Sequence, residues 1–247
     1  MAQEAPVRRV SADAKKSAPT ISAIKISAIV PAYNEAARIA PVLDVLVSYP
    51  GFAEVLVVDD GSTDGTGEVA SARGARVVRS PKKSGKGAAM QRGVDAAVGD
   101  LIFFCDADIV GLTHETIDEI VAPVRRGDTE MFIGMIDRRI YDAPFIIRFV
   151  PLLGGIRALS RALWKRTPRR FKQGFEIETA LNYYAAHPGR PQHKVFPGLS
   201  QTVKEKKYAV LRGTYWRWRM VLDILATNWA LHFGAAAVAA SEAQPEL

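Results

Sequence analysis

The chain has 247 residues, 48% of them hydrophobic, which is enough for one α/β domain, or two small ones, with a sizeable core. Its single cysteine, Cys105, excludes an intrachain disulfide framework and a cysteine-based metal site, and suits a reducing compartment. The formal net charge is +7, but the stretch 138–172 holds ten Arg or Lys and one acid, so it carries +9 and the rest of the chain −2. The basic character therefore belongs to one segment of the chain.

The terminal segments are not typical of export or membrane signals. Residues 1–24 contain basic residues but no apolar run, which predicts a flexible basic tail rather than a signal peptide. Residues 220–240 come nearest to a membrane span, but Asp223, Asn228 and His232 interrupt them. We expect no transmembrane helix, and a second flexible tail over 235–247.

Strands and helices alternate through the first half of the chain. Short apolar runs predict strands over 24–32, from 54, over 75–79, over 99–105 and over 130–135. Helical patterns follow at 39–46, from about 66, after the Gly- and Lys-rich stretch that starts at 81, and over 113–124 with Thr113 as N-cap. This order predicts a parallel sheet with right-handed crossovers. Ligands of such sheets bind at the carboxyl ends of the strands, where Asn34, Asp60 and Lys86 fall.

Two aspartates, Asp106 and Asp108, follow the most apolar of these strands. If the chain stays extended, residues two apart point the same way, so the carboxylates would lie close together. At about 4 Å and an effective dielectric near 20, two such charges repel by roughly 4 kcal/mol. A divalent cation would relieve this repulsion, and hard oxygen ligands suit Mg²⁺ or Mn²⁺ better than zinc. The alternative is a pair of N-capping residues before the next helix.

Four motifs in this order carry a family resemblance: IVPAYNEA (29–36), VVDDGSTDGT (57–66), KSGKGAAMQRG (83–93) and CDAD (105–108). Together they resemble the nucleotide-sugar-binding half of family-2 glycosyltransferases of the GT-A fold, especially dolichyl- and polyprenyl-phosphate hexosyltransferases. The resemblance implies an α/β, Rossmann-like fold with a mostly parallel central sheet flanked by helices, and acceptor-side helices in the C-terminal part. It covers residues 26 to about 136 well and the rest loosely.

The resemblance also implies a set of binding residues. Nucleotide-binding positions would be Pro31, Ala32, Tyr33, Glu35, Asp60, Lys86, Asp106 and Ala107, with Lys86 near the pyrophosphate and Asp106 and Asp108 on the metal. Asp60 would contact the nucleoside, whereas Asp59 is better explained as a cap of the turn through Ser62. The lysine-rich stretch has an alternative as a solvated loop.

The second half of the chain offers candidates for the acceptor side. GFEIETALNYY (174–184) has helical spacing, and the resemblance favours an acid at its start, so Glu176 is the first choice for a catalytic base and Glu178 the second. Both acids would also stabilise the helix through its dipole, which is the alternative. A phosphate acceptor is already an oxyanion and would need no base.

The basic segment predicts how the acceptor is held. Arg157, Arg161 and Lys165 recur every four residues opposite apolar positions, which is typical of a cationic amphipathic helix on anionic lipid, or of a core helix with a solvated face. Relatives commonly carry Ser-Arg where this chain has Met135-Ile136-Asp137. Arg138 and Arg157 are therefore the acceptor-binding candidates, and His193 is a weaker candidate for the metal.

The leading hypothesis is a Mg²⁺- or Mn²⁺-dependent, inverting hexosyltransferase that uses a UDP- or GDP-hexose and a polyprenyl-phosphate or other lipid-linked acceptor. Residues 25–136 would bind the nucleotide sugar and residues 137–234 the acceptor. We expect a cytoplasmic protein in peripheral contact with the inner face of the membrane, with no nucleic-acid partner. Three alternatives stay open: a glycosyltransferase with a small soluble acceptor, a sugar nucleotidylyltransferase, and a non-catalytic basic module for membrane or nucleic acid. The second is disfavoured because VPAYNEA lacks the glycines of a nucleotidylyltransferase loop.

Overall fold

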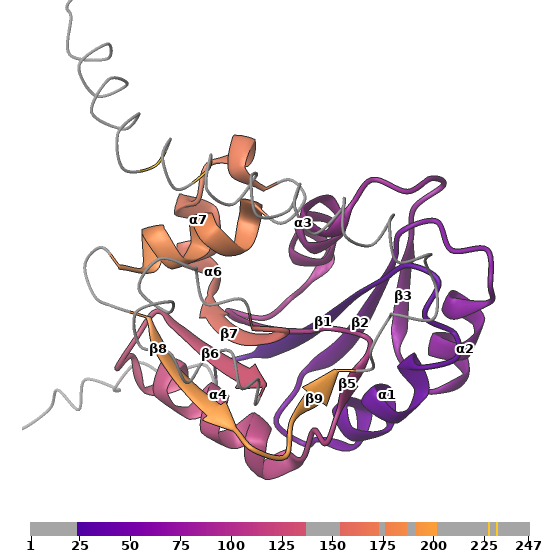
Figure 1. Cartoon of the computed structure of the whole chain (residues 1–247), viewed down its shortest axis with the longest axis horizontal. Helices are drawn as coiled ribbons and strands as arrows, with labels where there is room; N and C mark the ends of the chain where they lie inside the picture. Colours follow the sequence, from indigo (N-terminus) through magenta and orange to yellow (C-terminus); the bar gives the residue numbers. More distant parts are fainter. Residues whose placement is uncertain are drawn as a thin grey trace, which may run out of the picture.

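The computed structural model describes residues 24–136, 154–172, 176–186 and 191–201, together with Thr227 and Leu231 (Figure 1). The predicted tails, apart from residue 24, lie outside these residues, and so does Arg138. Within the part of the chain that is described, no helix is long and apolar enough to cross a bilayer.

A seven-stranded sheet forms the centre of the fold, in the order β3-β2-β1-β4-β7-β6-β8. Its strands are β1 Ile26–Ala32, β2 Glu54–Asp59, β3 Arg76–Arg79, β4 Leu101–Cys105, β6 Met131–Ile136, β7 Ile156–Ser160 and β8 Gln192–Phe196. Neighbouring strands from β3 to β4 run parallel, and so do β6 and β8, whereas β7 runs antiparallel between β4 and β6. The predicted mostly parallel sheet is confirmed. A small antiparallel ribbon pairs β5, Ile109–Val110, with β9, Ser200–Gln201.

Helices cover both faces of the sheet, as Figure 1 shows. They are α1 Ile39–Ser48, α2 Thr66–Ala72, α3 Lys86–Ala96, α4 His114–Arg126, α6 Arg161–Arg166, the short 3₁₀ helix η2 Arg169–Phe171, and α7 Glu176–Ala185. Helices α1, α2 and α4 contribute to the core on one face, and α3, α6 and α7 to the core on the other. The sheet is therefore buried on both sides, which explains why its central strands are continuous apolar runs.

Side-chain alternation and end signals explain these elements locally. In β1, Ala28 and Val30 join one core while Ile29 joins the other. Helix α4 starts where it was predicted, because the Thr113 side chain accepts a hydrogen bond from the backbone N–H of Thr116. The residue that follows α4, Gly127, has a φ of +79°, the left-handed conformation that glycine adopts most readily.

The predicted cationic amphipathic helix around residues 156–165 is wrong. Residues 156–160 form β7, whose Ile156 and Ala158 lie in one core and Leu159 in the other. The apolar residues of this segment fit the two-residue repeat of a strand as well as the repeat of a helix. Pairing with β4 and β6 stabilises the strand. Helix α6 begins only after Ser160, whose side chain accepts from the N–H of Leu163. The basic residues of this segment therefore do not form one lipid-facing surface.

Candidate active site

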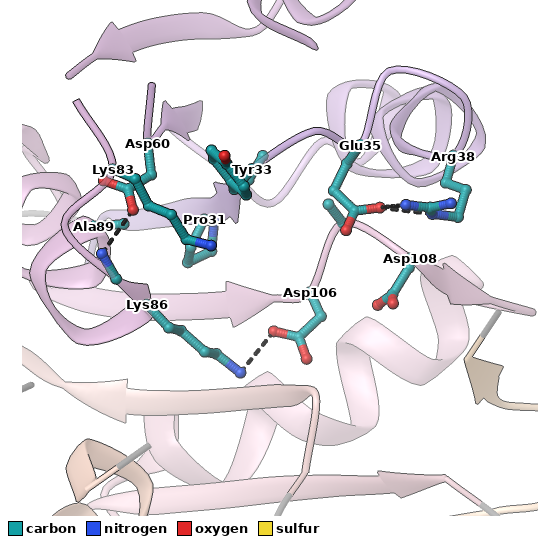
Figure 2. A pocket seen from close by; sticks show the side chains of 13 residues that line it. Pro31, Tyr33, Glu35, Arg38, Asp60, Lys83, Lys86, Ala89, Asp106 and Asp108 are labelled. Carbon is teal, nitrogen blue, oxygen red and sulfur yellow. Dashed lines mark hydrogen bonds and ion pairs between the residues drawn. The ribbon is translucent and has the colours of Figure 1, made fainter. Parts of the chain in front are cut away.

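A cavity of about 400 Å³ lies at the carboxyl ends of β1, β2 and β4 (Figure 2). The loops that follow these parallel strands meet at one edge of the sheet, which brings residues from four sequence motifs together. The residues that line it are Pro31, Ala32, Tyr33, Glu35, Arg38, Asp60, Lys83, Gly85, Lys86, Ala89, Asp106, Ala107 and Asp108. Every predicted nucleotide- and metal-binding position is on this list.

One part of the cavity offers an aromatic ring and three charged groups. The ammonium of Lys83 lies 4.0 Å from the ring centroid of Tyr33, within cation–π range. Glu35 and Arg38 form an ion pair with an O–N distance of 2.6 Å. The backbone N–H of Glu35 also donates to Thr66 Oγ1, which ties the loop after β1 to the start of α2. Tyr33 is thus held on a fixed backbone, with a cation against its ring.

The two adjacent acids after β2 have different partners. Asp59 accepts hydrogen bonds from the N–H of Ser62 at 2.8 Å and from Arg79 Nε at 3.1 Å. Its predicted role as the cap of this turn is confirmed, and it is absent from the lining of the cavity. Asp60 does line the cavity, but its carboxylate accepts from α3 and the loop before it, including the N–H of Gly85 at 2.7 Å and Arg92 Nη2 at 2.5 Å.

The acid pair after β4 lies on the cavity wall. Asp106 forms an ion pair with Lys86 Nζ at 2.9 Å and accepts from Gln201 Nε2 at 3.1 Å. The chain turns at Ala107 and Asp108 instead of staying extended, yet both carboxylates face the cavity (Figure 2). Burial raises the pKa of Asp106, Lys86 opposes this effect, and the nearby carboxylates of Glu178 and Asp108 add to it.

This donor set fits a Mg²⁺ or Mn²⁺ ion. Both ions prefer oxygen ligands and are commonly held by one or two carboxylates, with water and phosphate oxygens in the other positions. Among the described residues, no three His, Cys, Asp or Glu side chains gather into a site that would hold a metal without such outside ligands. His193 does not join the aspartates: it is exposed on β8, at the edge of the sheet. The weaker prediction of His193 as a metal ligand is therefore wrong.

A second cluster of charges adjoins the acid pair. Lys86 Nζ lies 2.7 Å from Glu178 Oε1, and Arg157 Nη2 lies 3.4 Å from Glu178 Oε2. The side chain of Arg157 is only 2% exposed, and its Nη1 has no hydrogen-bond partner within the described ranges. Helix α7 places Glu178 in this cluster, whereas Glu176 is the half-buried first residue of the helix.

The charges of this cluster hold each other ionised. Burial favours a neutral Glu178, but Lys86 and Arg157 outweigh it and hold the pKa of the carboxyl below its ordinary value. Burial likewise disfavours the charged form of Lys86, but Asp106 and Glu178 raise the pKa of the ammonium well above its usual range. A buried carboxylate held between two cations is a weak proton acceptor.

Four side chains of this region were not predicted from the sequence: Arg38, Lys83, Arg92 and Gln201. Lys83 stands inside a motif that was singled out, so its position next to another lysine was a usable signal. Arg92 also stands inside that motif, but on the predicted helix, where an arginine is usually solvated. Arg38 lies outside the four motifs, at the N-cap of α1. Gln201 reaches Asp106 from a two-residue strand, which is too short to predict from any periodicity.

Comparison with known proteins gives a consistent family. Residues 27–183 match the family model described as Glycosyl transferase family 2. A dolichyl-phosphate beta-glucosyltransferase from Trichomonas vaginalis is 43% identical over 94 residues, which are 32% of this chain and 28% of the relative. A dodecaprenyl-phosphate galacturonate synthase from Rhizobium johnstonii is 32% identical over 126 residues, 46% of this chain and 36% of that protein. These matches span well under half of the relatives' lengths.

The structural comparison extends further along the chain. A crystal structure of glucosyl-3-phosphoglycerate synthase from Mycobacterium tuberculosis, in complex with Mn²⁺, UDP and glucosyl-3-phosphoglycerate, has a TM-score of 0.69 and 26% identity. It covers 84% of this chain and 80% of that chain. The predicted GT-A fold is thereby confirmed. Because the family model matches most of the chain, including every residue that lines the cavity, the chain belongs to glycosyl transferase family 2.

Proposed function

We propose that the protein is a metal-dependent hexosyltransferase that moves a hexose from a UDP-hexose to the phosphate of a polyprenyl phosphate, with inversion at the anomeric carbon. The observation that carries this proposal is the gathering of Asp106, Asp108 and Lys86 on one cavity with the ring of Tyr33. A ring for the base, a cation for the diphosphate and two carboxylates for a metal are the groups that a nucleoside diphosphate requires. The Mn²⁺ and UDP in the similar crystal structure support the same donor.

On the donor side, Asp106 and Asp108 would hold the Mg²⁺ or Mn²⁺ ion. When bound, the ion supplies Lewis-acid stabilisation of the departing diphosphate. Lys83 and Lys86 bring two further positive charges to the cavity wall, where they would neutralise phosphate oxygens. Tyr33 would stack against the base, in exchange for its contact with Lys83.

On the acceptor side, the charges around Glu178 favour a nucleophile that needs no base. A hydroxyl must lose its proton as it attacks, whereas a phosphate monoester is already an oxyanion at neutral pH. Glu178 is ion-paired with Lys86 and Arg157 and has a lowered pKa, so it is poorly suited to remove a proton. We assign it a positioning role, with Arg157 as its buried partner. Peripheral contact with a membrane would follow from a lipid acceptor and is part of the same proposal.

A soluble phosphorylated acceptor that attacks through a hydroxyl is the second candidate. The observation that favours it is the likeness to glucosyl-3-phosphoglycerate synthase, which extends over 84% of the chain and so beyond the nucleotide-binding half. In that case a base is needed. Because Glu178 is engaged in ion pairs, Glu176 at the start of α7 is the candidate for this base.

Isothermal titration calorimetry tests the donor side of this proposal. UDP should bind more tightly than GDP, and its affinity should fall at least tenfold when Mn²⁺ is replaced by excess EDTA. The Asp108→Ala variant should bind UDP with the same affinity in either buffer, because one metal carboxylate is gone. Asp118→Ala, on the outer helix α4, is the matched control and should behave like the wild type. Equal UDP affinity of the wild type with and without metal would overturn the proposal.

A further inference from the structure

The loop before α3 is tied to a side chain from another strand. This loop, residues 81–85, is called the lysine loop. It carries Lys83 and is followed by Lys86, and both lysines line the cavity. Asp60, from the end of β2, accepts hydrogen bonds from the backbone N–H of Ser84 at 2.9 Å and from Ser84 Oγ at 2.6 Å. It also accepts from the N–H of Gly85 at 2.7 Å.

A fourth donor comes from the helix itself. Arg92 of α3 donates to Asp60 at 2.5 Å and to Ser84 Oγ at 2.6 Å, so the arginine binds both the carboxylate and the loop. A carboxylate offers about four lone-pair sites, and four donors already face this one. The side chain of Asp60 is 5% exposed. The carboxylate is thus engaged with the lysine loop and with Arg92.

The local backbone explains why the loop needs an outside acceptor. The N-cap of α3 is Gly85, which has a φ of +96° and no side chain with which to cap the helix. The first turn of α3 contains no acid and starts with Lys86. Asp60 therefore supplies from a distance the anionic cap that the helix lacks.

Close packing supports the same arrangement independently. Gly61, next to Asp60, has a φ of +76°, and a Cβ atom there would lie 2.8 Å from the carbonyl carbon of Lys82. Only a glycine lets the end of β2 approach the backbone of the lysine loop this closely. Both the hydrogen bonds and the contact thus join β2 to the segment that carries the lysines.

We propose that Asp60, held by Arg92, is a positioning residue that fixes the lysine loop so that Lys83 and Lys86 face the diphosphate. This rests on the proposed function only in taking a nucleoside diphosphate as the ligand. The positioning role comes in addition to the nucleoside contact that the family resemblance implies for Asp60. Positioning acts on the phosphate end of the ligand, so its loss affects all diphosphates, including one without a base.

Hydrogen exchange of the free protein tests the anchor without any ligand. In Arg92→Met, the peptide that contains residues 81–86 should exchange its amides at least tenfold faster than in the wild type. Arg79→Met is the matched control, because Arg79 forms ion pairs with the neighbouring Asp59 and with Glu68 instead of Asp60. Its exchange in 81–86 should be unchanged. Unchanged exchange in Arg92→Met, with a normal thermal unfolding midpoint, would overturn the proposal whatever the protein binds.

Binding of inorganic pyrophosphate, UDP and GDP in the presence of Mn²⁺ tests the role. Arg92→Met should weaken all three ligands by about tenfold or more and leave the ratio of UDP to GDP affinity as in the wild type. Asp60→Asn should weaken pyrophosphate, which has no base, by a similar factor. Variants that keep the pyrophosphate affinity of the wild type would show that the lysines do not depend on Asp60, and would overturn the proposal. No binding of UDP to the wild type would overturn the proposed function instead, and the exchange experiment would still decide about the anchor.

Discussion

Arg157 is a buried charge in the part of the site where we propose that the acceptor binds. It stands on β7 opposite Phe104 of β4 and Ile133 of β6, in an apolar layer where an isolated cation would be costly. Its nearest charge is Glu178, and its Nη2 also donates to the carbonyl oxygen of Gly154. The sequence suggested Arg157 as a surface group for acceptor phosphate, whereas the structure places it beneath α7.

Replacement of Arg157 should therefore destabilise the fold through Glu178. Arg157→Met leaves the buried carboxylate of Glu178 with Lys86 as its one remaining ion-pair partner among the described residues, and should lower the free energy of unfolding by about 3 kcal/mol at neutral pH. The double variant Arg157→Met, Glu178→Gln should recover part of this loss, because no unpaired charge remains. Urea unfolding measures both values. Arg126→Met, an exposed helix-end arginine, is the control, and equal losses in the single and double variants would contradict this account.

The pair Asp59 and Asp60 marks the limit of sequence reasoning at this scale. A turn cap within three residues, such as Asp59 to Ser62, follows from local geometry and could be predicted. The partners of Asp60 lie 24 to 32 residues further along the chain, so only the packed fold brings them together. The family resemblance located Asp60 at the site but gave no physical account of its neighbours.

The helices and strands of the first half of the chain could be predicted because each sequence pattern there fits only one kind of secondary structure. Strands β1 to β4 are short apolar runs closed by Gly, Pro or Asp, and α4 has both of its end signals. Strand β7 could not be predicted, since its five residues fit either period and it pairs with β4, more than 50 residues earlier, as well as with β6. The ribbon of β5 and β9 is shorter than any periodic signal.

The first residue of helix α6, Arg161, binds the end of α3, which the sequence pattern did not predict. Arg161 donates to three backbone carbonyl oxygens at the end of α3 and just beyond it: Val94 at 2.9 Å, Ala97 at 2.8 Å and Gly99 at 2.7 Å. A cation at this place satisfies carbonyls that the last turn of a helix leaves unpaired and also suits the helix dipole. The guanidinium is thus engaged inside the fold and not directed to lipid.

Arg161→Met should lower the free energy of unfolding by about 2 kcal/mol, the scale expected when charge-assisted hydrogen bonds are lost from a partly buried group. Arg161→Lys should lose less, because one ammonium still reaches one carbonyl. Lys165→Met is the matched control on the same helix: its side chain is exposed, and the change should stay within about 0.5 kcal/mol. Thermal or urea unfolding separates the three, and a Lys165 variant as unstable as Arg161→Met would refute the assignment.

Over the whole molecule, sequence similarity covers a smaller share of the chain than structural similarity does. The 43% identity to a dolichyl-phosphate enzyme is confined to 32% of the chain, whereas the likeness to glucosyl-3-phosphoglycerate synthase covers 84%. The acids and lysines that line the cavity all precede residue 109, so the proposed donor site belongs to the first part of the chain. We propose that acceptor choice depends on the remainder, where the charges around Glu178 are the most informative feature.

The last prediction concerns that choice. With UDP-hexose and Mn²⁺, we expect transfer to a polyprenyl phosphate presented in anionic vesicles, and a β-linked product from an α-linked donor, read by NMR. Because a phosphate oxyanion needs no base, Glu176→Gln should keep its turnover within about tenfold of the wild type, whereas removal of a general base typically costs 10²–10⁴-fold. Glu178→Gln should raise the KM for the lipid more than it lowers kcat, as befits a positioning residue.

The same variants with a soluble phosphorylated acceptor supply the opposing result. If 3-phosphoglycerate is the better substrate, vesicles have no effect and Glu176→Gln loses turnover by 10²-fold or more, then a hydroxyl is the nucleophile and Glu176 its base. That outcome would leave the donor half of the proposal intact, since the donor half rests on the cavity lined by Asp106, Asp108, Lys86 and Tyr33 and not on Glu176. It would also mean that the exposed cations Lys165 and Arg169 contribute to solubility and do not bind an anionic membrane leaflet. At such a leaflet, each cation would add about 1 kcal/mol of salt-sensitive attraction.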